Sequence, residues 1–179
     1  MLTIELPAQA SQTAFNERRW TELAADPALA KIEGRIETDR HGQIIMSPPP
    51  AARHVRYQNR ISFILQTLLP EGEALTDCPI STADGVRVAD SAWLSKATLK
   101  ELGNRQCFPK APEICVEVLS PDNTERAINE KAALYFDAGA REVWICDKYG
   151  TMRFLPSAAA RSLPESKICP LFPTQIKLD

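Results

Sequence analysis

The central segment of the chain, residues 114–146, constrains the fold more than any other part of the sequence. Residues 114–119 are apolar at nearly every position, as expected for a central strand that is covered on both faces. Residues 124–138 carry apolar side chains at helical spacing, and Gly139 follows them as a C-cap. A second apolar stretch, residues 142–146, completes the order strand, helix, strand, which is the signature of a parallel crossover. The sequence therefore predicts an α/β fold.

The remaining elements follow from periodicity and from the positions of proline and glycine. They are a helix over 13–26, a hairpin over 31–47 with Gly42 in its turn, a helix over 52–69, a strand over 86–94, and short strands at 151–155 and 174–178. A chain of 179 residues fits one domain better than two. We predict a single domain over residues 1–179, built on a mixed β-sheet flanked by helices, with residues 1–12 as a peripheral N-terminal extension.

Three charged residues occupy positions that the pattern assigns to the interior. Asp90 falls in an apolar phase of the strand over 86–94, and Glu117 stands in the middle of the most apolar strand. Lys131 lies on the apolar face of the helix over 124–138. Because an unpaired buried charge is costly, these three side chains are expected to meet in space.

Two chemical interpretations of this trio are open. Two carboxylates held close together repel, and one takes up a proton unless a cation lies between them. A divalent ion such as Mg²⁺ or Mn²⁺ supplies that cation and prefers carboxylate and carbonyl oxygens as ligands. The alternative is a purely structural ion-pair network, or single charged side chains at edge positions.

A group of basic side chains marks the start of the helix over 52–69. Arg53, Arg56 and Arg60 recur at helical spacing beside His54, and they are candidates for binding phosphates. A solvated basic face explains the arginines equally well, and His54 has three candidate roles: metal ligand, phosphate ligand or helix cap.

The overall charge and the cysteines limit the class of protein. The net charge is −2 and the pI is about 5.8, which does not favour a nucleic-acid partner unless a cleft is locally basic. The five cysteines show no CxxC spacing, and we predict a reducing, cytoplasmic location. No stretch approaches the roughly 18 apolar residues of a membrane helix.

Four stretches of the sequence resemble one known family. APEICVEVLSPDNTERAINEKAALYFDAGAREVWICD resembles the defining segment of the Uma-type restriction endonucleases, which belong to the PD-(D/E)xK nuclease superfamily. RIETDRHGQIIMSPPPAARHVRYQNRI, GVRVADSAWLS and PLFPTQIKL resemble the N-terminal block, the block with the metal-binding aspartate and the closing strand of that family. The resemblance covers about residues 13–179 and implies a restriction-endonuclease-like fold.

The resemblance assigns roles to the trio. Asp90 matches the aspartate of the "PD" motif, although Ala89 stands where the motif has its proline. Glu117 matches the acidic residue of "(D/E)xK", while the usual lysine position is Leu119. In this family the lysine comes from the following helix, where Lys131 lies.

Weaker matches extend the candidate site. Glu37 matches the N-terminal glutamate of the family, and His54 matches the histidine before its first long helix. The helix over 52–69 lacks the acidic residue that some relatives carry there. The site could therefore hold either one metal ion or two.

The resulting hypothesis is a metal-dependent endonuclease. Asp90, Glu117 and the main-chain carbonyl of Val118 are expected to bind Mg²⁺ or Mn²⁺, and Lys131 is expected to stabilise the transition state. The expected substrate is nucleic acid, with DNA favoured, and the expected assembly is a homodimer. The alternatives are a non-catalytic nucleic-acid-binding module or a protein-interaction module on the same fold.

Overall fold

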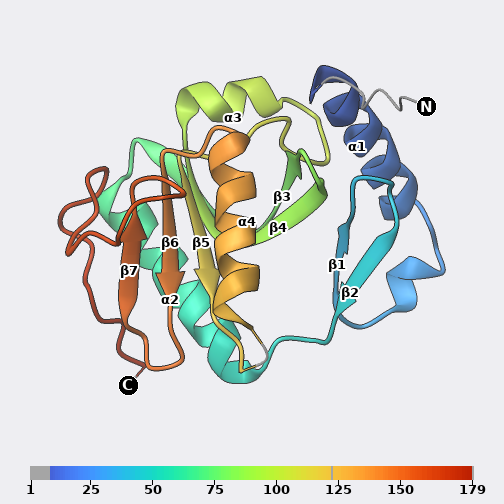
Figure 1. The fold of residues 1–179 in the computed structure, drawn as a ribbon. Helices are drawn as coiled ribbons and strands as arrows, with labels where there is room; N and C mark the ends of the chain where they lie inside the picture. Colours follow the sequence, from blue (N-terminus) through green and yellow to red (C-terminus); the bar gives the residue numbers. More distant parts are fainter. Residues whose placement is uncertain (1–8, 122, 179) are drawn as a thin grey trace, which may run out of the picture.

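A five-stranded mixed sheet stands at the centre of the computed structural model, which describes residues 9–121 and 123–178 (Figure 1). In spatial order the strands are β3 (Gly72–Thr82), β4 (Gly85–Ser95), β5 (Ile114–Val118), β6 (Glu142–Cys146) and β7 (Met152–Leu155). β5 and β6 are parallel, and every other neighbouring pair is antiparallel. The predicted α/β class and mixed sheet are confirmed.

Two helices cover opposite faces of the sheet, α2 (Ala52–Leu68) on one and α4 (Glu125–Asp137) on the other (Figure 1). Ile61 of α2 packs in a buried cluster with Val116, whereas Tyr135 of α4 packs in a second cluster with Cys115. Alternate residues of β5 therefore face different helices. By this alternation the side chain of Glu117 faces α4.

An N-terminal unit packs beside β4. It consists of α1 (Gln9–Ala24), a short 3₁₀ helix (Leu29–Lys31), β1 (Arg35–Thr38) and β2 (Ile44–Ser47). The two strands form an antiparallel hairpin whose turn contains Gly42 at a φ of 76°, a conformation that glycine adopts without strain. The hydroxyl of Thr38 accepts a hydrogen bond from the Val86 amide at 2.9 Å. This contact fixes β1 across β4.

The structure differs from the expected N-terminus. Helix α1 begins at Gln9 and not at residue 13, and the side chain of Gln12 donates to the carbonyl of Arg40 at 3.0 Å. Residues 9–12 of the expected extension therefore belong to a packed helix, while residues 1–8 lie outside the described residues.

Three further elements depart from the expectations. β3 and the short helix α3 (Lys96–Leu102) were not predicted, and residues 174–178 form no strand beyond one bridge between Thr151 and Gln175. β3 is an edge strand, where a proline such as Pro79 is tolerated. Its outer edge pairs with the main chain of Phe108, which accepts from Ser81 and donates to Pro79. No helix in the described ranges is both long and apolar enough to cross a membrane.

Candidate active site

The candidate site lies where β4 and β5 diverge. Pairing between these strands ends at Ser91 and Val116, one residue before Asp90 and Glu117. Asp90 is 1% exposed and Glu117 is 5% exposed, so both carboxylates are withdrawn from bulk water. The Val118 amide donates to Asp90 Oδ2 at 2.6 Å. This bond fixes the Asp90 carboxylate in the fork, the opening between β4 and β5 that holds Asp90 and Glu117.

Lys131 reaches this fork from α4. Its Nζ lies 3.1 Å from Glu117 Oε2, 2.9 Å from Glu37 Oε1 and 3.0 Å from the carbonyl oxygen of Val88. The helix is anchored at its start by the Thr124 hydroxyl, which accepts from the Ala127 amide. Three of the residues singled out in the sequence, Glu37, Glu117 and Lys131, therefore form one ion-paired group.

Glu37 and Tyr135 complete the surroundings of this group. Glu37 Oε1 also accepts from the Val88 amide at 2.7 Å, which joins β1 to β4. Tyr135 is fully buried, and its hydroxyl donates to Glu117 Oε1 at 2.7 Å. Tyr135 is thus a core residue whose hydroxyl also orients a carboxylate of the site.

Asp90 is held by two further side chains. Arg35 Nη1 lies 2.5 Å from Asp90 Oδ1, and His54 Nε2 lies 3.1 Å from the same oxygen. The structure places His54 in the site and not in a capping role, since the N-cap of α2 is Ala51 without a side-chain bond. His54 Nδ1 is buried and has no hydrogen-bond partner among the described residues.

Arg35 is a site residue that the sequence analysis missed. It lies two residues before Glu37 on β1, so both side chains point to the same face of the strand. That spacing is a signal in the sequence, because placing Glu37 in the site also places Arg35 there. Its guanidinium makes a second ion pair, from Nη2 to Asp77 Oδ1 at 2.8 Å.

The pKa values of the two buried carboxylates are shifted in opposite directions. Burial raises the pKa of Glu117 to about 7; Lys131 and Tyr135 oppose this shift, while repulsion from Asp90 and Glu37 adds to it. Burial would also raise the pKa of Asp90, but the His54 hydrogen bond and the charge of Arg35 together hold it below the ordinary value. Carboxylates with opposed shifts in one cleft are typical of functional sites.

Lys131 and Arg35 both stay charged despite their surroundings. Burial alone would lower the pKa of Lys131, but Glu117, Glu37 and Asp90 outweigh it and raise that pKa above its usual value. Burial also disfavours the charge on Arg35, and the attraction of Asp90 again raises the pKa. The cations of the site are therefore permanent counter-charges to its carboxylates.

The site opens into a cleft of about 860 Å³. Its lining includes the segment Pro48–Pro50 and the loop that follows β5. Five basic side chains (Arg35, Arg53, Arg87, Lys131, Lys148) and five acidic ones (Glu37, Asp84, Asp90, Glu117, Glu130) line it. With His neutral, the cleft is thus electrically balanced and not basic.

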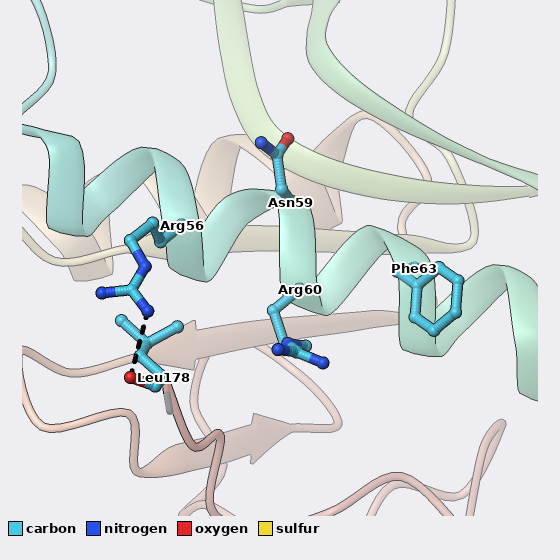
Figure 2. A pocket seen from close by; sticks show the side chains of 5 residues that line it. All are labelled: Arg56, Asn59, Arg60, Phe63 and Leu178. Atoms are coloured by element: carbon cyan, nitrogen blue, oxygen red, sulfur yellow. Dashed lines mark hydrogen bonds between the residues drawn. The ribbon is translucent and has the colours of Figure 1, made fainter.

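Arg56 does not line this cleft, and its expected role in binding phosphates stays a prediction. With Asn59, Arg60, Phe63 and Leu178 it lines a separate depression of about 370 Å³ on α2 (Figure 2). One guanidinium nitrogen of Arg56 donates to the carbonyl oxygen of Leu178 at 3.1 Å. Arg53, one turn earlier on the same helix, does line the cleft.

The donor atoms of the fork fit a divalent cation in chemical type. Asp90 and Glu117 present carboxylate oxygens, which are the preferred ligands of Mg²⁺ and Mn²⁺. Among residues 9–121 and 123–178, no three histidine, cysteine, aspartate or glutamate side chains converge as a preformed metal centre. A metal ion here would therefore depend on two carboxylates, main-chain oxygen and water.

The raised pKa of Glu117 predicts a pH dependence of stability in the metal-free protein. Between the ordinary carboxyl pKa of 4.5 and about 7, the unfolded chain releases a proton that folded Glu117 keeps. The stabilisation is full below the ordinary value and is lost as pH rises through the folded value. We expect the free energy of unfolding, measured by urea titration with a chelator, to fall on the order of 1–3 kcal/mol across this window.

Glu117→Gln is the control for this pH effect. The variant keeps a side chain of the same shape but cannot titrate, so its stability should change less over the same pH range. Asp90 does not interfere, because its lowered pKa acts only as pH falls below its ordinary value of 3.8. Parallel pH profiles for wild type and variant would show that Glu117 has no raised pKa.

Comparisons with known proteins agree with the fold described above. A solved structure described as a putative nuclease belonging to DUF820 from Anabaena variabilis ATCC 29413 is similar in fold, with a TM-score of 0.62 at 19% identity. The similarity covers 76% of this chain and 80% of that one. No curated protein matches. The Uma2 family model, described as putative restriction endonuclease, matches residues 21–161, and the chain therefore belongs to this family.

Proposed function

We propose that the protein is a divalent-metal-dependent endonuclease that hydrolyses phosphodiester bonds of nucleic acid, with DNA as the favoured substrate. One observation carries the proposal: Asp90, Glu117 and Lys131 come from three different elements and converge at the floor of one cleft. Membership of a family of restriction endonucleases supports the same reaction.

Each residue of the fork has a proposed role. Asp90 and Glu117 would hold the ion together with the carbonyl of Val118. The Val118 amide already points to Asp90, and the carbonyl of a strand residue points to the same side as its amide. When bound, the ion would supply a water of lowered pKa and polarise the phosphate. Lys131 would stabilise negative charge on the phosphate, and Glu37 holds Lys131 toward the cleft.

The charge balance of the cleft supports a role for the cation in substrate binding. Five basic and five acidic side chains line the cleft, so a bound divalent ion makes it positive. A cleft made positive by a bound ion would attract nucleic acid even though the chain has a net charge of −2.

The decisive test is thermal unfolding with and without Mn²⁺. Wild type should gain roughly 2.7 kcal/mol of stability at about one hundred times the dissociation constant, because the ion binds the folded state. Asp90→Ala and Glu117→Ala should gain nothing. Asp84→Ala is the matched control, since Asp84 lines the same cleft but pairs with Arg87, and it should respond like wild type.

The outcomes separate the candidate functions. A response confined to wild type and Asp84→Ala justifies cleavage assays on single- and double-stranded DNA and RNA. If neither wild type nor any variant gains stability from Mn²⁺, even with a substrate analogue present, the metal-dependent mechanism is wrong.

Arg53 and Arg60 form a matched pair for testing where the substrate lies. Both are arginines on α2, but Arg53 lines the cleft and Arg60 lines the outer depression (Figure 2). Arg53→Ala should weaken DNA binding and lower the slope of log K against log salt by about 1, as for one lost phosphate contact. Arg60→Ala should leave the slope unchanged. Equal effects would place the substrate outside the cleft.

A non-catalytic module on the same fold is the second candidate, and one observation favours it. Every carboxylate oxygen of Asp90 and Glu117 already has a protein partner, so neither carboxylate requires a metal for folding. The Mn²⁺ experiment decides between the two candidates. The homodimer stays a prediction, which light scattering tests directly.

A further inference from the structure

Arg35 bridges two aspartates that differ strongly in exposure. One end of its guanidinium contacts Asp90, whose side chain is 1% exposed, and the other end contacts Asp77, whose side chain is 62% exposed. The Arg35 side chain itself is 18% exposed and lines the cleft. The same cation is thus shared between the floor of the site and its rim.

The backbone explains why both carboxylates reach one guanidinium. In the ladder between β3 and β4, Thr76 pairs with Ser91 and Cys78 with Ala89, while no pairing joins Asp77 and Asp90, which lie between them. Asp77 has a φ of 50°, a left-handed conformation that aspartate adopts more readily than most residues. Arg35 reaches this local break in the ladder from β1, which contacts β4. Two carboxylates and the guanidinium therefore meet there.

We propose that Arg35 is the built-in counter-ion of Asp90 and that a divalent metal ion binding to Asp90 displaces the Arg35 guanidinium toward Asp77. The inference rests on the proposed metal-dependent nuclease and adds a regulating residue to it. Without a metal, the buried carboxylate of Asp90 needs a cation, and Arg35 supplies one. Because the metal must compete with this cation, its apparent affinity is reduced.

The other cations of the site are not placed for this role. Lys131 pairs with Glu117 and Glu37 and not with Asp90. His54 contacts the same Asp90 oxygen as Arg35, but at 3.1 Å, and it carries a charge only when protonated. Arg35 combines a permanent charge, the shorter contact to Asp90 and a second acceptor at Asp77.

The test compares Mn²⁺ affinity, measured by calorimetry, in wild type, Arg35→Gln and Arg87→Gln. Arg87 is the matched control: it lines the same cleft, but it donates to the Thr38 carbonyl and pairs with Asp84. Either substitution removes one positive charge from the cleft, so a general electrostatic effect is common to both. We expect Arg35→Gln to melt lower without metal but to bind Mn²⁺ about tenfold more tightly, and Arg87→Gln to change affinity far less.

Each outcome decides the inference. If wild type binds Mn²⁺ and Arg35→Gln binds equally or more weakly, Arg35 is not a competing counter-ion, while the proposed nuclease stands. If neither binds Mn²⁺, both proposals fail together. If Arg35→Gln does not fold, Arg35→Lys is used instead. Lysine keeps the positive charge but lacks the two guanidinium nitrogens that bridge both aspartates. A rise in the Mn²⁺ affinity of Arg35→Lys supports the displacement, and unchanged affinity overturns it.

Discussion

Replacing Lys131 with alanine is expected to lower the rate of phosphodiester hydrolysis by about a hundredfold or more. The Nζ of Lys131 lies 3.1 Å from Glu117 Oε2 and 2.9 Å from Glu37 Oε1, and the residue lines the cleft. A fixed ammonium at this place stabilises charge that develops on the phosphate in the transition state. Single-turnover cleavage with Mg²⁺ measures the effect on the chemical step.

Two controls separate chemistry from folding in this experiment. Loss of Lys131 leaves Glu117 and Glu37 without their shared cation and is expected to cost about 3–5 kcal/mol of stability, so rates are compared at equal folded fraction. Lys148→Ala is the matched control, because Lys148 lines the same cleft but lies beside the Tyr149 ring. A folded Lys131→Ala protein that cleaves at the wild-type rate would refute the catalytic role.

The parallel crossover was predictable because its signals are local. β5 and β6 are continuous apolar stretches, and α4 between them has a capping Thr124 and a terminal Gly139. The predicted bounds agree with the observed ones to within about one residue. Each of these signals depends only on neighbours in the sequence, so no knowledge of the tertiary structure was needed.

β3 was not predictable in the same way. It is an edge strand of mixed polarity that contains Pro79, and it is held by residues distant in sequence, β4 on one side and Phe108 on the other. Its apolar residues do not alternate regularly, and helices α1, α2 and α4 all contact it. This segment forms a strand because of the residues that pair with it, and these are distant in the sequence.

The candidate site likewise contains residues that the sequence alone could predict and residues that it could not. Asp90, Glu117 and Lys131 were found because a charge inside an apolar pattern is conspicuous. Arg35 stands in a short strand of mixed polarity, and only the packing of β1 on β4 brings it to Asp90. Helical spacing alone placed Arg56 beside Arg53, but Arg53 lines the cleft whereas Arg56 lines the separate depression.

Replacing Asp90 with alanine is expected to lower the free energy of unfolding of the metal-free protein by about 3–5 kcal/mol. The substitution removes the buried partner of Arg35 and leaves the Val118 amide without its acceptor. Repulsion between Asp90 and Glu117 opposes this loss, since it disappears in the variant. The ion pair should dominate because Arg35 and His54 both lie on the same Asp90 oxygen. Urea titration in the presence of a chelator measures the difference.

A double-mutant cycle shows whether that loss comes from the Arg35 pair. If Arg35 and Asp90 stabilise one another, the combination of Asp90→Ala with Arg35→Gln should cost less than the sum of the two single changes by about 1–3 kcal/mol. A cycle between Asp90→Ala and Arg87→Gln should be close to additive, because Arg87 pairs with Asp84 instead. Additivity in both cycles, or a metal-free Asp90→Ala protein more stable than wild type, would mean that carboxylate repulsion governs the fork. The site would then depend on a bound cation for its stability, and Arg35 would not serve as its substitute.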